Sequence, residues 1–273
     1  MPDFEKLAAE CAQLRCQIID TIYHAGSGHC GGSLSSVEIM WTLYSEILRV
    51  RPGEPDWPDR DRFVLSKGHA APTLYAVLAE KGFIEKDGLK TLRRAGSPLQ
   101  GHPDMRKVPG VEMSSGSLGM GISVGVGMAL AARLSGSGRK TYVLVGDGEL
   151  QEGQNWEALM SARKFGLSNL IVIVDRNDVQ LDGRTEEIMP LGDVAAKIRS
   201  FGWEVEECDG HRCGPIYEAV AWAGRAESGP RAVVAYTVKG KGVSFMEGES
   251  AWHGKRMTAE DYETARGDLE VTR

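Results

Sequence analysis

The sequence predicts an α/β protein with a doubly wound, mainly parallel sheet that carries helices on both faces. Two short runs, TYVLV and NLIVIV, are apolar and β-branched without alternation, which is typical of strands buried on both faces. The segment between them, residues 152–167, has the composition of a crossover helix, which two parallel strands require. Strand and helix patterns alternate along residues 1–273 without a recognisable boundary, so a single domain is expected.

The first segment of the chain is predicted as an amphipathic helix. Residues 4–23 carry apolar side chains at helical spacing, and the pattern ends at Gly26. A glycine-rich loop that contains His29 follows. Ser35 and Glu38 have the spacing of a capping box, which predicts that another helix begins there.

The next segment is predicted as strand, turn and helix. Residues 62–65 form the strand, and SKGHA supplies the turn with His69. The stretch 95–117, which contains His102, has no clear periodicity. Irregular stretches of this length in a compact domain are usually functional. A glycine-crowded helix, GISVGVGMALAARL, is expected after it.

The last third continues the alternation. The pattern predicts helix, strand, helix and strand in turn, over residues 190–201, 202–208, 215–226 and 231–238. A second glycine-rich loop with His253 follows the last strand, and a charged tail is expected from Thr258.

Polar residues follow each of the two central strands. Asp147 stands in the turn after the first strand, and Asn177 follows the second. Because parallel strands end at the same sheet edge, both side chains are expected in one crevice, where ligands of such sheets bind. Hard oxygens of this kind suit Mg²⁺. Gly146 and Gly148 would let the backbone approach a phosphate, although GDG alone can be a simple strand-to-turn signal.

Composition excludes several classes of partner. The net charge is −6, so no overall positive field predicts binding to nucleic acid or to an anionic membrane surface. The first residues, MPDFEKLAAE, are charged throughout and do not resemble a signal peptide, which makes a cytoplasmic location the expectation. Five cysteines without a C-x-x-C spacing are expected to be reduced and mostly buried.

Most of the histidines stand next to glycine. Five of the six have a glycine neighbour, and four of those five lie in loops at predicted strand or helix ends: His29, His69, His102 and His253. Imidazole in such a loop can bind phosphate or exchange protons with a substrate. Each histidine alone could equally be a polar loop residue. His211 and His24 are left out of the predicted site, since helix-terminal roles account for them.

The motifs together carry a family resemblance. SGHCGGSLS, DRFVLSKGHA, GHPD, SSGSLGMGISVGVGMALA, GDGELQEGQNWEA, DRNDVQLDG, GKG and WHG resemble, in order, the motifs of the diphosphate-binding domain of transketolase. The resemblance covers about residues 10–257. It departs from the family at Cys30 and Ser117, where proline is usual.

This resemblance implies thiamine diphosphate held through Mg²⁺, with Ca²⁺ or Mn²⁺ as substitutes. It implies three metal ligands, namely Asp147, Asn177 and the carbonyl of Val179. His29, His102 and His253 would be catalytic. The implied cofactor-binding residues are His69, Gly116, Leu118, Gly146, Asp147, Gly148, Glu149, Asn177 and His253. Glu152 matches a subunit-interface residue of the family, although simple exposure at the start of a helix also fits a carboxylate there.

The resemblance covers only the first of three transketolase domains. It therefore implies the N-terminal subunit of a split enzyme that passes a two-carbon unit from a ketose phosphate to an aldose phosphate. The pyrimidine-binding domain would lie on a C-terminal subunit, in a heterotetramer with two copies of each subunit. Three alternatives stay open: a non-catalytic subunit that binds thiamine diphosphate, a component of a 2-oxoacid dehydrogenase, and an enzyme like deoxyxylulose phosphate synthase.

Overall fold

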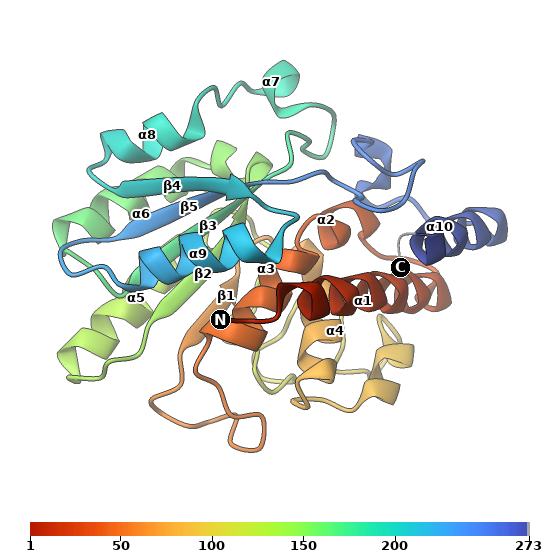
Figure 1. Cartoon of the computed structure of the whole chain (residues 1–273), viewed down its shortest axis with the longest axis horizontal. Helices are drawn as coiled ribbons and strands as arrows, with labels where there is room; N and C mark the ends of the chain where they lie inside the picture. The colour runs from red at the N-terminus through yellow and green to blue at the C-terminus, as the bar shows by residue number, and fades with distance from the viewer. Residues whose placement is uncertain (272–273) are drawn as a thin grey trace.

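The computed structural model describes residues 1–271 and confirms the predicted fold class. Five strands form one sheet in the order β1-β2-β3-β5-β4, and every neighbouring pair is parallel. The strands are β1 (Arg62–Leu65), β2 (Thr141–Gly146), β3 (Leu170–Arg176), β4 (Glu204–Asp209) and β5 (Arg231–Tyr236). Because all strands run the same way, their carboxyl ends share one edge of the sheet (Figure 1).

Helices cover both faces of this sheet. The longer helices are α1 (Phe4–Ala25), α4 (Ala71–Glu80), α5 (Gly121–Leu134), α6 (Gly153–Lys164), α9 (Cys213–Gly224) and α10 (Ala259–Val271). The shorter ones are α2 (Cys30–Leu34), α3 (Val37–Thr42), α7 (Thr185–Ile188) and α8 (Val194–Ser200). Single turns of other helix types occupy Leu43–Ile47, Gly68–Ala70, Lys86–Thr91, Gly148–Gln151 and Ser250–His253.

The two central strands are buried along their whole length, as their composition predicts. Successive side chains of a strand point to opposite faces, so β2 and β3 supply both halves of the core. Leu144 and Ile173 join the cluster that includes α1, α3, α4 and α9. Val143 and Val172 join the second cluster, with α5, α6 and α8. A sheet packed on both sides explains why these strands read as continuous apolar runs.

The predicted capping box between Ser35 and Glu38 is wrong, because Glu38 forms a buried ion pair with Arg15 instead. Helix α3 begins at Val37, and the Ser35 hydroxyl donates to the Gly32 carbonyl and, at 2.6 Å, to Asp175. Both oxygens of Glu38 instead accept from the Arg15 guanidinium, at 2.5 and 2.6 Å. Burial alone would raise the pKa of Glu38, but Arg15 and a hydrogen bond from His211 outweigh it and hold that pKa at about 2.

The charged tail expected from Thr258 is wrong as well, because most of it forms α10. This helix packs along α1, and the rings of Tyr23 and Tyr262 stack with centroids 4.1 Å apart. The Tyr262 hydroxyl donates to Asp20 at 2.9 Å. Ala265 and Leu269, four residues apart, are buried against the rest of the protein. One narrow apolar stripe is therefore enough to dock a helix whose composition is otherwise charged.

One helix start lies later than the sequence predicts. Helix α8 begins at Val194 rather than at residue 190, because Asp193 caps it by accepting from the Ala196 amide. Helix α6 begins at Gly153, after a single helical turn that follows Asp147. The strands at 202–208 and 231–238 and the helix at 215–226 are confirmed to within a few residues at each end.

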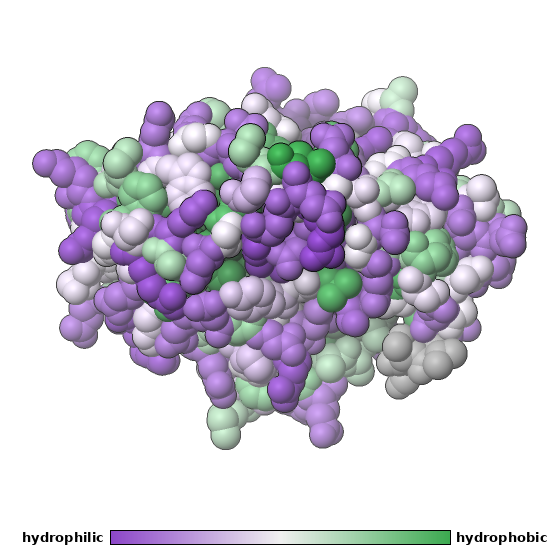
Figure 2. Space-filling view, turned by 90° about the horizontal axis from the view of Figure 1, so that it is seen from above, coloured by the Kyte–Doolittle hydropathy of each residue, from purple (hydrophilic) through white to green (hydrophobic). Residues whose placement is uncertain are grey.

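The cysteines and the surface agree with the predicted composition class. All five cysteines lie outside disulfides, and four of them are buried. No helix within residues 1–271 combines the length and apolar character needed to cross a membrane. Seen from the side of α7 and α8, the surface is mostly hydrophilic and its hydrophobic residues lie in small separate groups (Figure 2).

We expect Glu38→Gln to destabilise the fold, because it leaves the buried Arg15 without a countercharge. The free energy of unfolding should fall by about 3–5 kcal/mol in urea denaturation at pH 7. Glu54→Gln, on an exposed ion pair with Arg51, is the control and should change it by less than about 0.5 kcal/mol.

The same variant gives a pH test. The pKa of Glu38 is depressed on folding, so its stabilisation is present above the unfolded pKa of about 4.3 and is lost as pH falls toward 2. The stability gap between the wild type and Glu38→Gln should therefore narrow from pH 5 to pH 2. A gap that stays constant over this range would contradict the ion-pair assignment.

Candidate functional site

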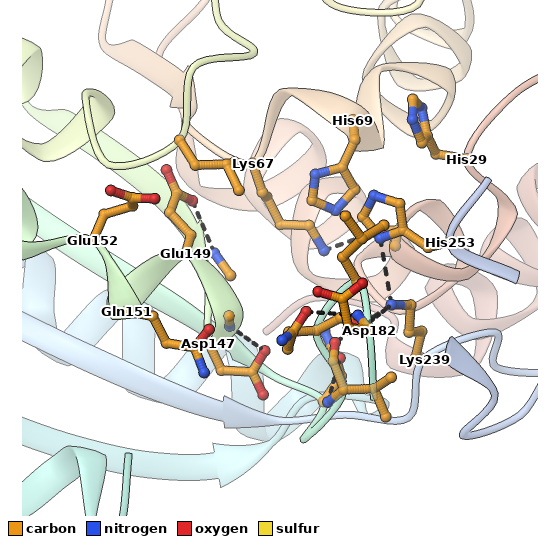
Figure 3. A pocket seen from close by; sticks show the side chains of 18 of the residues that line it. His29, Lys67, His69, Asp147, Glu149, Gln151, Glu152, Asp182, Lys239 and His253 are labelled. Carbon is orange, nitrogen blue, oxygen red and sulfur yellow. Dashed lines mark hydrogen bonds between the residues drawn. The ribbon is translucent and has the colours of Figure 1, made fainter. Parts of the chain in front are cut away.

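A cavity of about 370 Å³ opens at the carboxyl edge of the sheet. The turns after β1, β2 and β3 line it, together with the loops that carry His29, His102 and His253 (Figure 3). The sequence predicts thirteen site residues, and all thirteen line this cavity, brought together by loops from different parts of the chain. These are His29, His69, His102, Gly116, Leu118, Gly146, Asp147, Gly148, Glu149, Glu152, Asn177, Val179 and His253.

Asp147 is the most deeply placed carboxylate that follows β2. Its side chain is 1% exposed, and its two oxygens accept from the amides of Gly148, at 2.7 Å, and Asp178, at 2.5 Å. Burial, reinforced by the charge of Asp175, raises the pKa of Asp147 to about 7. A nearby cation would stabilise the ionised form of this buried carboxylate and would lower its pKa again.

The turn after β3 brings the other predicted ligands to the same place. Asn177 lies beside Asp147 on the cavity wall, and its side-chain oxygen accepts from the Val179 amide at 3.2 Å. Asp178 between them has a φ of 61°, a left-handed conformation that is uncommon outside glycine. This conformation turns the chain so that the Val179 carbonyl faces the cavity side, where Lys239 contacts it at 3.4 Å.

Two positions at the cavity require glycine, because neighbouring residues lie too close for a side chain. A Cβ on Gly148 would lie 2.7 Å from the Cβ of Gln180, so the turns after β2 and β3 can meet only without a side chain there. Gly116 has a φ of 141°, and a Cβ on it would lie 3.1 Å from the His102 ring. The glycines flagged in the sequence thus bring backbone amides to the cavity.

Four histidines form one cluster over the cavity. The ring centroid of His29 lies 5.8, 5.4 and 5.3 Å from those of His69, His102 and His253, and His69 lies 4.8 Å from His253. Burial lowers the pKa of all four rings, to about 3 for His29 and about 4 for His253. Nearby cations lower these pKa values further, so the rings are neutral near pH 7. His211 and His24 lie outside the cluster, as predicted.

A buried ion pair at the inner wall of the cavity, which Lys67 lines, was not predicted from the sequence. The Lys67 ammonium contacts Asp175, and the two side chains are 1% and 0% exposed. Lys67 also donates to the Gly32 carbonyl at 2.9 Å. Burial would raise the pKa of Asp175, but Lys67 outweighs burial and holds it below its usual range. Both residues stand inside motifs quoted above, SKGHA and DRND, where the neighbouring histidine and asparagine drew attention instead.

Lys239 was not predicted either, and it supplies a further positive charge at the cavity. Its ammonium lies 3.1 Å from the Gln180 carbonyl and 3.4 Å from Nδ1 of His253. Burial, together with the charge of Lys67, lowers the pKa of Lys239 to about 8. The only sequence signal for it is its place between β5 and the glycines of the KGKG loop.

Glu149 holds the loop that carries Gly116 and Leu118. Its carboxylate accepts from the Ser66 hydroxyl, from the Gly119 amide at 2.9 Å and from the Gly146 amide at 3.1 Å. Burial raises the pKa of Glu149, and these hydrogen bonds oppose that rise. The side chain therefore ties the ends of β1 and β2 to the loop before α5. Its predicted contact with a cofactor stays a prediction.

Glu152 lies at the mouth of the cavity, just before α6. It is exposed, and its carboxylate makes no hydrogen bond or ion pair with residues 1–271. Its predicted place in a subunit interface stays a prediction. In the same part of the chain, no group of three or more His, Cys, Asp or Glu side chains could hold a metal. The predicted ligand set is of another kind, with one carboxylate, one amide oxygen and one carbonyl.

The fold and the site define an α/β domain with a cavity at the carboxyl edge of its sheet, the place where open sheets of this kind bind ligands. A family model described as "Transketolase, thiamine diphosphate binding domain" matches residues 7–272. The chain belongs to this family.

Two similar relatives have about the same length as this chain. A 6-deoxy-6-sulfo-D-fructose transketolase subunit, SqwG, from Clostridium sp. (strain MSTE9) is 45% identical, over 94% of this chain and 94% of its own. An apulose-4-phosphate transketolase subunit from Phocaeicola vulgatus is 43% identical, over 96% of this chain and 92% of its own.

Longer transketolases match over part of their length. The human enzyme is 38% identical over 94% of this chain and 41% of its own. The crystal structure of transketolase from Campylobacter jejuni has a TM-score of 0.92 at 32% identity, over 98% of this chain and 43% of that one. The chain thus spans about two fifths of these longer proteins.

We expect Glu149→Gln to loosen the wall of the cavity. A glutamine amide nitrogen cannot accept a hydrogen bond, so at least one buried donor loses its partner, at a cost of about 1–3 kcal/mol in the free energy of unfolding. Hydrogen exchange measured by mass spectrometry should become faster in residues 116–121. Glu157→Gln, on the exposed face of α6, is the control. Unchanged exchange in 116–121 would show that Glu149 does not hold this loop.

Proposed function

We propose that this chain is the N-terminal subunit of a thiamine-diphosphate-dependent transketolase, which transfers a two-carbon ketol unit from a ketose to an aldose in complex with a partner subunit. One observation carries the proposal: Asp147, Asn177, Lys239 and the four clustered histidines line a single cavity at the carboxyl edge of the sheet. Family membership and the two relatives of matching length support it.

The residues present fit a divalent metal. Asp147, Asn177 and the Val179 carbonyl would be the protein ligands, all hard oxygens that suit Mg²⁺, with Ca²⁺ or Mn²⁺ as substitutes. The supporting observation is the buried Asp147 carboxyl, whose raised pKa a cation would reverse. Water and phosphate oxygens usually complete the shell of such an ion.

The residues present also fit a diphosphate. The Lys239 ammonium and the neutral rings of His69 and His253 are donors on one side of the cavity, and Gly148 lines the same cavity. Gly116, Leu118, Gly146 and Glu149 would complete the wall around the cofactor. A charged lysine together with neutral imidazoles gives a moderate positive field, which favours an anion.

The remaining histidines are placed to handle the sugar. When bound, thiamine diphosphate supplies a nucleophilic carbon that adds to the carbonyl of the ketose. His29, His102 and His253 would hydrogen-bond the carbonyl and hydroxyl oxygens of the substrate, and those rings whose second nitrogen is free would move protons between them. Neutral imidazoles can do both, because each ring has one donor and one acceptor nitrogen.

The proposed partner is a C-terminal subunit that carries the pyrimidine-binding domain, in a heterotetramer with two copies of each subunit. The two relatives of matching length are both named as transketolase subunits. Glu152 is exposed at the cavity mouth, where it could meet a second chain. Sugar phosphates are the proposed substrates and the cytoplasm the proposed location. The net charge of −6 gives no reason to add nucleic acid or membrane partners.

The comparisons do not favour the other two enzyme classes considered, the 2-oxoacid dehydrogenases and the enzymes like deoxyxylulose phosphate synthase. Within the chain itself, the loops that carry His29, His69 and His102 all reach the cavity, as the transketolase resemblance requires. A non-catalytic subunit that binds thiamine diphosphate is the remaining alternative, and activity measurements on the complex separate the two.

We expect metal binding to depend on Asp147 and to release protons. Because burial raises the pKa of Asp147 to about 7, more of this carboxyl is protonated at pH 6.5 than at pH 8.5. Calorimetry with Mg²⁺ and thiamine diphosphate, in buffers of different ionisation enthalpy, should therefore show proton release at pH 6.5 that disappears by pH 8.5.

Asp147→Asn should abolish this proton release and weaken metal-dependent cofactor binding by at least about tenfold. Asp182→Asn, which removes another carboxylate from the same cavity wall, should cost far less. Equal losses in the two variants would show that Asp147 is not a specific ligand.

We expect ketol transfer only in the complex. Co-expression with the transketolase-like C-terminal subunit of the same organism should give a stable complex that is active with at least one ketose in a coupled assay. The panel should contain phosphorylated and sulfonated ketoses. The chain purified alone should be inactive, and robust transfer by it would overturn the two-subunit proposal. A stable complex that binds the cofactor yet transfers nothing across the panel would support the non-catalytic alternative.

A further inference from the structure

Arg93 lies behind His29 and outside the cavity wall. One guanidinium nitrogen, Nη2, lies 3.1 Å from Nδ1 of His29, and Nη1 lies 3.4 Å from the Ser27 hydroxyl. His29 lines the cavity, beside His69 and His253 in Figure 3, whereas Arg93 does not. Arg93 therefore contacts the cavity through the His29 ring, and its charge also adds to the burial that lowers the pKa of His102.

The chemistry of this contact fixes the protonation of His29. A guanidinium can only donate hydrogen bonds, so Nδ1 of His29 must accept and carry no proton. The proton of the neutral ring is then on Nε2, which makes no hydrogen bond with residues 1–271. Burial and the charge of Arg93 lower the pKa of His29 to about 3, in agreement with a ring that stays neutral.

The backbone and a neighbouring glycine hold Arg93 in this place. Arg93 and Asp178 are the two non-glycine residues with positive φ in the described chain, and the φ of Arg93 is 60°. The Arg93 amide donates to the Leu99 carbonyl at 2.8 Å. A Cβ on Gly101 would lie 2.7 Å from Nε and Nη2 of Arg93, so the guanidinium occupies the space that a side chain would need.

The surroundings direct the guanidinium at the ring rather than at an acid. Within residues 1–271 the Arg93 guanidinium forms no ion pair with a carboxylate, and its hydrogen-bond partners are Ser27 and His29. The groups that face His29 from other elements are His69, His102 and His253, with Lys239 further away, and none of them is an acid. None of these neighbours is a carboxylate that could accept a proton from Nδ1 of His29 in place of the contact with Arg93.

We propose that Arg93 is a positioning residue that fixes His29 as the neutral Nε2–H tautomer and so presents this ring as a hydrogen-bond donor. The inference rests on the proposed function for the identity of the acceptor, which is an oxygen of the sugar substrate. With Nδ1 taken by Arg93, His29 donates from Nε2 and has no nitrogen left to act as a base. Proton abstraction then belongs to another histidine of the cluster.

The tautomer can be observed directly by two-bond ¹H–¹⁵N NMR on the full chain labelled with ¹⁵N-histidine, and a His29→Gln variant assigns the signal. The wild type should show His29 as the Nε2–H form from pH 5 to 8. Arg93→Asn, which tolerates a left-handed backbone, should give mixed tautomers and a pKa nearer the usual 6.5. A predominant Nδ1–H form in the wild type would overturn the proposal.

Gly101→Ala gives a second test that leaves Arg93 in the sequence. The added methyl group displaces the flexible end of Arg93, so the His29 signal should change as it does in Arg93→Asn. Arg94→Asn is the control, because this exposed neighbour removes the same charge without a side-chain contact to His29. Unchanged His29 signals in both Arg93→Asn and Gly101→Ala would contradict the inference.

Kinetics of the complex separate positioning from general structure. Arg93→Asn and Gly101→Ala should lower kcat by about tenfold to a hundredfold and change the thiamine diphosphate Kd by less than about twofold. Arg93→Lys, which keeps a donor, should recover part of kcat. Equal losses in kcat and cofactor affinity would indicate a structural role and defeat the proposal. Because the NMR result does not depend on ketol transfer, an inactive wild-type complex would count against the proposed function alone.

Discussion

The buried contact between Lys67 and Asp175 sets both the geometry and the charge of the site. Asp175 is the second-last residue of β3, and its carboxylate also accepts from Ser35, before α3, and from Thr237, after β5. Lys67 follows β1 and donates to the Gly32 carbonyl in α2. A pair with 1% and 0% exposed side chains is tolerated only where further hydrogen bonds satisfy it, and these are present. Four chain segments are thereby fixed relative to one another at the inner wall of the cavity.

The same pair distributes charge over the groups above it. Asp175 adds to the burial that raises the pKa of Asp147, while Lys67 adds to the burial that lowers the pKa of Lys239, His69 and His253. A bound cation would therefore stabilise the part of the cavity around Asp147. A bound anion would stabilise the part around Lys239, His69 and His253. A metal together with a diphosphate satisfies both parts at once, which neither group does alone.

The sequence could predict the features that depend on a repeated local pattern. Buried parallel strands read as continuous apolar runs, and the rule that their ends share one edge placed Asp147 beside Asn177 correctly. Lys67, Asp175 and Arg93 could not be found in this way. Each acquires its role from a partner at least 64 positions away in the chain, such as His29 for Arg93 and Lys67 for Asp175. The false capping box has the same cause, because the distant Arg15 takes Glu38 from its local hydrogen bond.

The shape of the cavity bears on the two-subunit proposal. Reactions of charged intermediates need water to be excluded, because hydrogen bonds and charges act strongly only in a dry site. The inner wall meets this need, since Asp147, Glu149 and Lys239 are all at most 2% exposed. The outer wall does not, because Leu118 is 36% and Leu181 60% exposed beside the exposed Glu152. Apolar side chains at an open mouth lose contact with water only when another surface covers them. The chemistry therefore favours a covering chain, and the proposed pyrimidine-binding subunit would close the site from this side.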